Sequence, residues 1–143
     1  MALLFLDFDG VLHRMNRVNG PFEFVDDFER VMRAYRAVDI VISSSWRDAR
    51  SIEELRCFFS DDIAGRIIDV TPQLSGPDHQ YSREAEIRAW MRTAGREDEF
   101  WVALDDCEEF FSPGCPELIL VDPNVGFNEA TEAELCRRLE GTA

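Results

Sequence analysis

The chain contains no lysine, because all fifteen of its basic residues are arginine. Schiff-base chemistry on a lysine amine is therefore excluded, and any fixed positive charge in a site must come from arginine or from protonated histidine. Histidine is scarce as well, with His13 and His79 alone. The net charge of −14 repels polyanions, so we expect no non-specific binding to duplex nucleic acid.

Cysteine is present without any pairing pattern, at Cys57, Cys107, Cys115 and Cys136. The wide spacing indicates neither a zinc site nor a disulfide framework, so we expect reduced thiols and a cytoplasmic protein. No apolar run approaches the length that crosses a membrane, and the first apolar run lacks the basic flank of a signal peptide. We expect no membrane partner, and the sequence favours no particular oligomeric state.

Apolar segments that read as strands alternate with helical patterns along the whole chain. The expected strands are Ala2–Leu6, Ile40–Ile42, Ile67–Val70, Phe100–Leu104 and Glu117–Val121. Alternation of this kind predicts an α/β fold, a three-layer Rossmann-like sandwich around a central five-stranded parallel sheet with right-handed crossovers. A length of 143 residues with 45% hydrophobic residues predicts one domain over 1–143.

The turn and capping signals mark where the predicted helices begin. Asn19-Gly20 predicts a tight turn in a short flap hairpin over about 11–22. Helix caps are expected at Asp26 or Asp27 and at Ser82. Capping boxes are expected at Ser51 with Glu54 and at Thr131 with Glu134.

Three polar clusters follow predicted strands. Asp7 and Asp9 come after the first strand and are followed by Gly10, which permits a sharp bend. Two neighbouring carboxylates repel one another unless a cation or a proton lies between them. Ser43–Ser45 and Asp105-Asp106 close two further strands, and open α/β sheets place their chemistry at this edge. The pattern predicts a metal-dependent carboxylate site.

These clusters resemble the four motifs of the haloacid dehalogenase (HAD) superfamily, a group of mainly magnesium-dependent phosphatases, over nearly the whole chain. The motifs match, in order, Asp7-Phe8-Asp9-Gly10, Ser43 with Ser44 as the alternative, Arg83 with Arg88 as the alternative, and Asp105-Asp106. The run Ser-Ser-Ser-Trp-Arg and the neighbourhoods of Arg83 and Asp105 also resemble the small HAD subgroup of "Swiss army knife" RNA-repair proteins.

The resemblance implies a role for each motif residue. Asp7 would attack phosphorus and form an aspartyl-phosphate, while Asp9 would protonate the leaving oxygen and then activate water. Mg²⁺ would be held by Asp7, by the backbone carbonyl of Asp9, and by Asp106 or Asp105. Ser43 or Ser44 and Arg83 would hold the phosphate oxygens. Phosphoryl transfer needs these parts: oxygen ligands for a hard cation, positive charge around the phosphate and an aligned nucleophile.

Several other residues have competing interpretations. Trp46 and Arg47 either line the entrance and bind substrate, or are a core tryptophan and a surface arginine. His13 either contacts a leaving group from the flap or is an exposed flap residue, and the exposed position is favoured. His79 reads as a loop residue. Phe110-Phe111 reads as core rather than as a stacking platform for a base.

The short segments between the motifs leave no room for a cap domain. An open site of this kind suits a large or protruding phosphorylated substrate: a nucleic-acid end, a phosphoprotein or a nucleotide. We therefore expect a magnesium-dependent phosphomonoester hydrolase. The alternative is a non-catalytic module that keeps the fold and binds metal or phosphate without turnover.

Overall fold

A parallel sheet forms the centre of the molecule in the computed structural model, which describes residues 2–74 and 80–141. Within these residues the sheet has five strands in the order β3-β2-β1-β4-β5. The strands are β1 Ala2–Leu6, β2 Val38–Ile42, β3 Ile67–Val70, β4 Phe100–Asp105 and β5 Leu118–Leu120. The predicted fold class, a five-stranded Rossmann-like sandwich without a separate cap domain, is confirmed.

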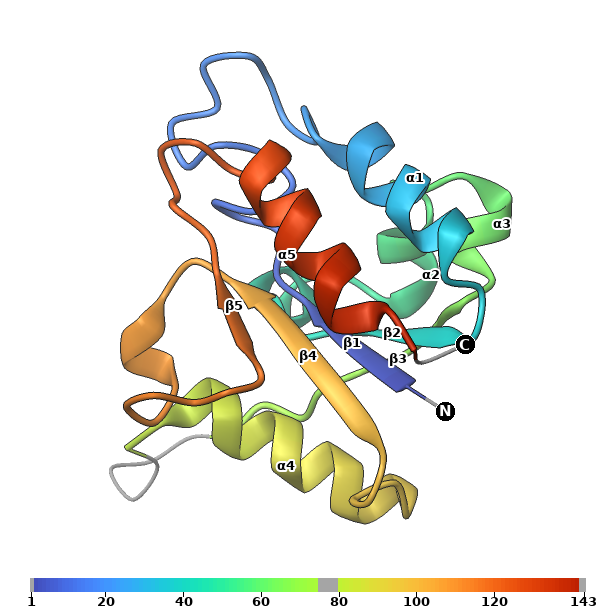
Figure 1. The fold of residues 1–143 in the computed structure, drawn as a ribbon, viewed down its shortest axis with the longest axis vertical. Helices are drawn as coiled ribbons and strands as arrows, with labels where there is room; N and C mark the ends of the chain where they lie inside the picture. The colour runs from blue at the N-terminus through green and yellow to red at the C-terminus, as the bar shows by residue number, and fades with distance from the viewer. Residues whose placement is uncertain (1, 75–79, 142–143) are drawn as a thin grey trace.

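Helices cover both faces of the sheet (Figure 1). Helix α4, Ser82–Ala94, lies on one face, and α1, Val25–Ala34, and α5, Glu129–Leu139, lie on the other. The shorter helices are α2 Ile52–Arg56 and α3 Asp61–Ala64, with 3₁₀ turns η1 Ser45–Asp48 and η2 Glu108–Phe110. No helix of the described residues is long and apolar enough to span a membrane.

The central strand β1 is fully buried because it has neighbours on both edges and both faces. Its side chains alternate between two cores: Leu4 and Leu6 pack with α1, α2, α3 and α5, while Leu3 and Phe5 pack against Trp90 of α4 and its surroundings. A strand buried on both faces needs an uninterrupted apolar sequence. The residues of β1, which precede Asp7, are therefore all apolar because both faces of the strand are buried.

The capping prediction at the start of α2 is confirmed, since Ser51 and Glu54 form a reciprocal capping box. The prediction for α5 is wrong, because that helix begins at Glu129 and the Asn128 side chain accepts from Thr131 N–H. Thr131 is therefore inside the helix rather than at its cap. The side chain that caps the helix is therefore that of Asn128, about one turn before the predicted cap at Thr131.

The caps predicted for α1 and α4 are also wrong. Helix α1 begins one residue before Asp26, and the capping position is Phe24, which makes no side-chain cap. Phe24 N–H instead donates to the carbonyl of Leu12 in the flap, a tertiary contact that local spacing does not encode. In α4, Tyr81 is the capping residue and Ser82 lies in the first turn.

The flap over 11–22 is a series of turns, so the predicted hairpin is wrong. The described residues of this segment contain no paired strands. Arg17 N–H donates to Arg14 O, and Gly20 N–H donates to Arg17 O, which places consecutive turns where strands were expected. Arg17 and Phe22 take positive φ values of 52° and 58°, and these left-handed residues redirect the chain.

Candidate active site

Three neighbouring strands deliver the predicted polar residues to one edge of the sheet. Leu6 of β1 is in register with Ile42 of β2 and with Leu104 of β4. Asp7 N–H donates to Leu104 O at 3.1 Å, and Ser43 N–H donates to Leu6 O at 3.0 Å. Because the strands are parallel and in register, Asp7, Ser43 and Asp105 emerge side by side at their carboxyl ends.

Three of the four predicted metal-site residues form a compact acidic cluster. Asp7, Asp105 and Asp106 each offer a carboxylate oxygen, and these oxygens lie within 4.8 Å of one another. Gly10 has a φ of 76°, and a Cβ there would come within 2.8 Å of Asp106 Cγ. Glycine is therefore required twice, for its left-handed backbone and for the space that the Asp106 side chain occupies.

Burial makes this cluster unfavourable as three bare carboxylates. Burial, reinforced by the charge of Asp105, raises the pKa of Asp7 well above its usual range. Burial also raises the pKa of Asp105 to about 7, despite the opposing charge of Arg83. Asp105 Oδ2 is buried without a hydrogen-bond partner among the described residues. Clustered oxygen ligands, one of them without a hydrogen bond, fit a hard cation such as Mg²⁺.

The Asp9 carboxylate lies outside this cluster and has its own set of donors. His13 Nε2 lies 2.8 Å from Oδ1, Arg17 Nη2 lies 3.1 Å from the same oxygen, and Trp46 Nε1 donates to Oδ2 at 3.1 Å. Burial alone would raise the pKa of Asp9, but the hydrogen bonds from His13, Trp46 and Arg17 outweigh it and lower that pKa. The side chain of Asp9 is thus separated from the three acids that could hold a cation.

Ser43 and Ser44 have different surroundings although both are buried. Ser43 Oγ has no hydrogen-bond partner among the described residues. Ser44 Oγ accepts from Trp46 N–H at 3.3 Å, which caps η1. A buried hydroxyl without a partner is unusual, so Ser43 has the free hydrogen-bonding capacity that a phosphate oxygen would use.

Arg83 is the arginine that reaches the acids. It lies in the first turn of α4, and its Nε is 3.5 Å from Asp105 Oδ2. Its Nε and Nη1 atoms are buried and make no hydrogen bond within the described residues. The alternative, Arg88, is half exposed and contacts Glu84 and Glu117 instead. Arg83 therefore carries buried donors without a hydrogen bond beside the acidic cluster.

Arg47 is buried, which corrects the interpretation as a surface arginine. Its side chain is 5% exposed and pairs with Glu86 at 2.9 Å. Its other N–H groups donate to backbone carbonyls, those of Ser43, Ser44, Thr71 and Pro72. With its donors directed at these acceptors, Arg47 ties together the segments that follow β2 and β3.

Trp46 is half-buried between the core and the Asp9 carboxylate. Its ring packs against Phe8, Phe22 and Phe58, and its Nε1 donates to Asp9. The guanidinium groups of Arg17 and Arg50 lie over the ring, 5.3 and 4.5 Å from its centroid. Trp46 thus packs at the edge of the core, and its side chain donates one hydrogen bond, to Asp9.

His13 lies in the site, although the sequence interpretation favoured an exposed flap position over contact with a leaving group. It was expected to be exposed on the flap, but it is fully buried and contacts Asp9. Its position four residues after Asp9, following the apolar pair Val11-Leu12, is the signal that could have identified it. Of the expected core pair, Phe111 is buried, whereas Phe110 is 38% exposed near Arg83. His79 lies outside the described residues.

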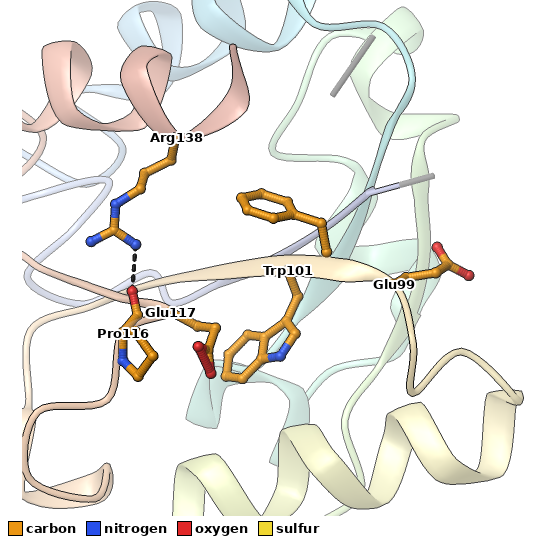
Figure 2. A pocket seen from close by; sticks show the side chains of 6 residues that line it. Glu99, Trp101, Pro116, Glu117 and Arg138 are labelled. Carbon is orange, nitrogen blue, oxygen red and sulfur yellow. Dashed lines mark hydrogen bonds between the residues drawn. The ribbon is translucent and has the colours of Figure 1, made fainter. Parts of the chain in front are cut away.

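A separate hollow of about 350 Å³ lies far from these acids along the sheet (Figure 2). It is lined by the start of β4, the segment before β5 and Arg138 of α5. Arg138 donates to the carbonyl oxygen of Pro116, as Figure 2 shows, which ties α5 to that segment. Because the hollow begins at Phe100 and the acids follow the other end of β4, the two are distinct.

Comparison with known proteins agrees with this arrangement. The family model described as the HAD domain in Swiss Army Knife RNA repair proteins matches residues 3–131. No curated protein and no solved structure matches the chain. The matched range runs from β1 into α5 and contains every residue of the acidic cluster. The chain therefore belongs to the HAD superfamily, among the HAD domains of Swiss Army Knife RNA repair proteins.

Proposed function

We propose that the chain is a Mg²⁺-dependent phosphomonoesterase that works through an aspartyl-phosphate on Asp7. The observation that supports the proposal is that a cluster of acids and a set of buried hydrogen-bond donors lie at the same edge of the sheet. Three acids that require a cation lie beside Ser43 and Arg83, whose buried donors have no hydrogen-bond partner within the described residues. A phosphate group would supply acceptors for those donors.

In the first step, an Asp7 carboxylate oxygen attacks phosphorus as the bond from phosphorus to the leaving oxygen breaks. Asp9 gives its proton to that oxygen, so the product leaves as an alcohol and Asp7 carries the phosphoryl group. Ser43 and Arg83 hold the phosphate oxygens on which negative charge is concentrated. The proposal gives the roles of nucleophile and proton donor to carboxylates with different surroundings, Asp7 in the acidic cluster and Asp9 beside the donors of His13 and Trp46.

In the second step, Asp9 takes a proton from water and the resulting hydroxide attacks the phosphoryl group. The bond from phosphorus to the Asp7 oxygen breaks, which releases inorganic phosphate and restores both carboxyl groups. The hydrogen bonds from His13 and Trp46 favour the ionised form of Asp9, and a base in this step needs that form. The proton given up in the first step is thus recovered in the second.

Asp7, Asp105 and Asp106 are the residues that would hold Mg²⁺, with the backbone carbonyl of Asp9 as the further oxygen proposed from the family resemblance. When bound, the cation neutralises the acids and the charge that develops on the phosphate. Asp105 and Asp106 both belong to the acidic cluster, so we propose that both are ligands of the cation.

A phosphorylated nucleic-acid end is the substrate that we favour over a phosphoprotein or a nucleotide. The name of the matching family places such domains in RNA repair proteins. A net charge of −14 disfavours contact with a long strand, but it does not oppose local capture of one phosphate by Arg83 and a cation.

The proposal is tested by hydrolysis of p-nitrophenyl phosphate with Mg²⁺, with EDTA, and by the variant Asp7→Asn. We expect EDTA to abolish turnover and Asp7→Asn to lower kcat by about 10³-fold or more, because the nucleophile is lost. Asp98→Asn is the matched control, since Asp98 is exposed and precedes β4 at the other end of the sheet.

Full activity in Asp7→Asn would contradict the mechanism. The non-catalytic alternative has a different result: calorimetry would detect Mg²⁺ binding, but a broad panel of phosphomonoesters, including 5′- and 3′-phosphorylated oligonucleotides, would show no turnover.

A further inference from the structure

We infer that His13 is a positioning residue for the Asp9 carboxyl group, with its ring proton held on the nitrogen that faces Asp9. The inference rests on the proposed function, because the direction of the Asp9 side chain affects the reaction only if Asp9 exchanges a proton with the leaving group.

Each ring nitrogen of His13 has one polar neighbour. Nε2 lies 2.8 Å from Asp9 Oδ1, and Nδ1 lies 3.2 Å from the backbone nitrogen of Phe22. The His13 side chain is fully buried, and the rings of Phe22 and Trp46 pack on it with centroids 5.4 and 5.8 Å away. This packing holds the imidazole plane, so Nε2 stays directed at Asp9.

The backbone N–H of Phe22 determines which nitrogen of the ring carries the proton. A backbone N–H only donates, so Nδ1 must accept, and the neutral ring then has its hydrogen on Nε2. His13 therefore donates to Asp9. Phe22 takes a φ of 58°, which is rare for a bulky residue, while its ring stacks on Phe58 with centroids 4.4 Å apart. The Phe22 N–H that orients His13 is thus supplied by a residue in a rare, strained backbone conformation.

His13 and Trp46 together fix both oxygens of Asp9, because His13 faces Oδ1 and Trp46 Nε1 donates to Oδ2. Arg17 also reaches Oδ1, but its side chain is 46% exposed, so this contact competes with water. The two packed donors therefore set the direction of the carboxyl group. Asp9 is not one of the three acids whose carboxylate oxygens lie within 4.8 Å of one another.

The test compares two substrates whose leaving groups differ in their need for a proton. p-Nitrophenolate leaves without protonation, whereas the alcohol of glycerol phosphate leaves only when its oxygen is protonated. The variant His13→Phe keeps the ring volume without an N–H, and His13→Gln keeps an N–H donor. We expect kcat/KM for glycerol phosphate to fall at least about 10-fold further than kcat/KM for p-nitrophenyl phosphate in His13→Phe, with most of the difference recovered in His13→Gln.

Equal losses on the two substrates, or no recovery by glutamine, would assign His13 a purely structural role and overturn the inference. A second measurement needs no turnover and covers the case in which His13→Phe does not fold. Long-range ¹H–¹⁵N NMR of the unmodified protein should show Nδ1 unprotonated and Nε2 protonated for His13, with His79→Gln assigning the signals. The opposite tautomer would overturn the inference.

Failure of the proposed function has a separate signature. The wild-type chain would then hydrolyse neither substrate, and this result would overturn the role of Asp9 together with the positioning role of His13. Turnover that requires Asp7 but shows no leaving-group dependence on His13 overturns the positioning role alone.

Discussion

At the scale of single residues, the site separates neighbours that the sequence presents as equivalent. Ser43 and Ser44 are adjacent and buried, yet Ser44 Oγ caps η1 whereas Ser43 Oγ has no partner within the described residues. Asp7 and Asp9 differ in the same way, because burial raises the pKa of Asp7 while hydrogen bonds lower that of Asp9. Environment, and not residue type, therefore sets the pKa of each carboxyl group and the hydrogen-bonding state of each hydroxyl.

Alanine substitution should separate the two serines. Ser43→Ala removes a proposed phosphate ligand, so we expect kcat/KM for p-nitrophenyl phosphate to fall by about 10- to 100-fold with little change in thermal stability. Ser44→Ala removes a cap and should lower the free energy of unfolding by about 1 kcal/mol while retaining most activity. Steady-state kinetics and thermal unfolding of both variants check this, and the reverse pattern would assign the phosphate to Ser44.

At the scale of elements, one buried ion pair joins the carboxyl ends of β2 and β3 to α4. Arg47 follows β2, donates to the carbonyls of Thr71 and Pro72 after β3, and pairs with Glu86 of α4. Glu86 also accepts from Leu74 N–H at 3.0 Å. Through Arg47, the loop that contains Ser43 is thus fixed to two other elements.

Breaking this pair should destabilise the fold far more than breaking a surface pair. Arg47→Ala leaves Glu86 charged and buried, and we expect it to lower the free energy of unfolding by about 3 kcal/mol. Arg88→Ala is the matched control, because Arg88 is 47% exposed and its loss should lower the same free energy by less than about 1 kcal/mol. Denaturant unfolding compares the two variants, and equal effects would remove Arg47 from this role.

At the scale of the whole molecule, the acidic cluster lowers the free energy of unfolding of the metal-free protein. Folding raises the pKa of Asp7, and it raises the pKa of Asp105 to about 7. The folded state therefore binds more protons than the unfolded state between pH 4 and 7. Stability falls with rising pH wherever the folded state binds more protons. These two groups therefore make the metal-free protein less stable as pH rises through this range.

Bound Mg²⁺ should reverse this loss. We expect Mg²⁺ to raise the midpoint of thermal unfolding more at pH 8 than at pH 5, because protons compete with the cation at the lower pH. Asp105→Asn should stabilise the EDTA-treated protein at pH 8 by on the order of 1–3 kcal/mol and diminish the response to Mg²⁺. Differential scanning fluorimetry with Mg²⁺ and EDTA at both pH values measures this. An identical response of Asp105→Asn and the wild type would exclude Asp105 as a ligand.

The sequence by itself determined the sheet and the edge at which the acids meet. A doubly buried parallel strand requires the continuous apolar run before Asp7, and parallel strands in register bring the residues that follow them to one edge. The strand–helix alternation and the four motif positions were therefore readable without coordinates. The Ser51 capping box was readable as well, because its partner Glu54 is local.

Only the tertiary structure decided which side chains are buried, partnered or free. The start of α1 and the burial of Arg47 depend on acceptors far away in the sequence, Leu12 O for Phe24 N–H and Glu86 for Arg47. His13 belongs to this class too, since the Phe22 backbone orients its ring and two aromatic rings bury it. A local pattern encodes contacts within a few residues, whereas the environment that assigns a role to each polar group is formed when distant segments pack.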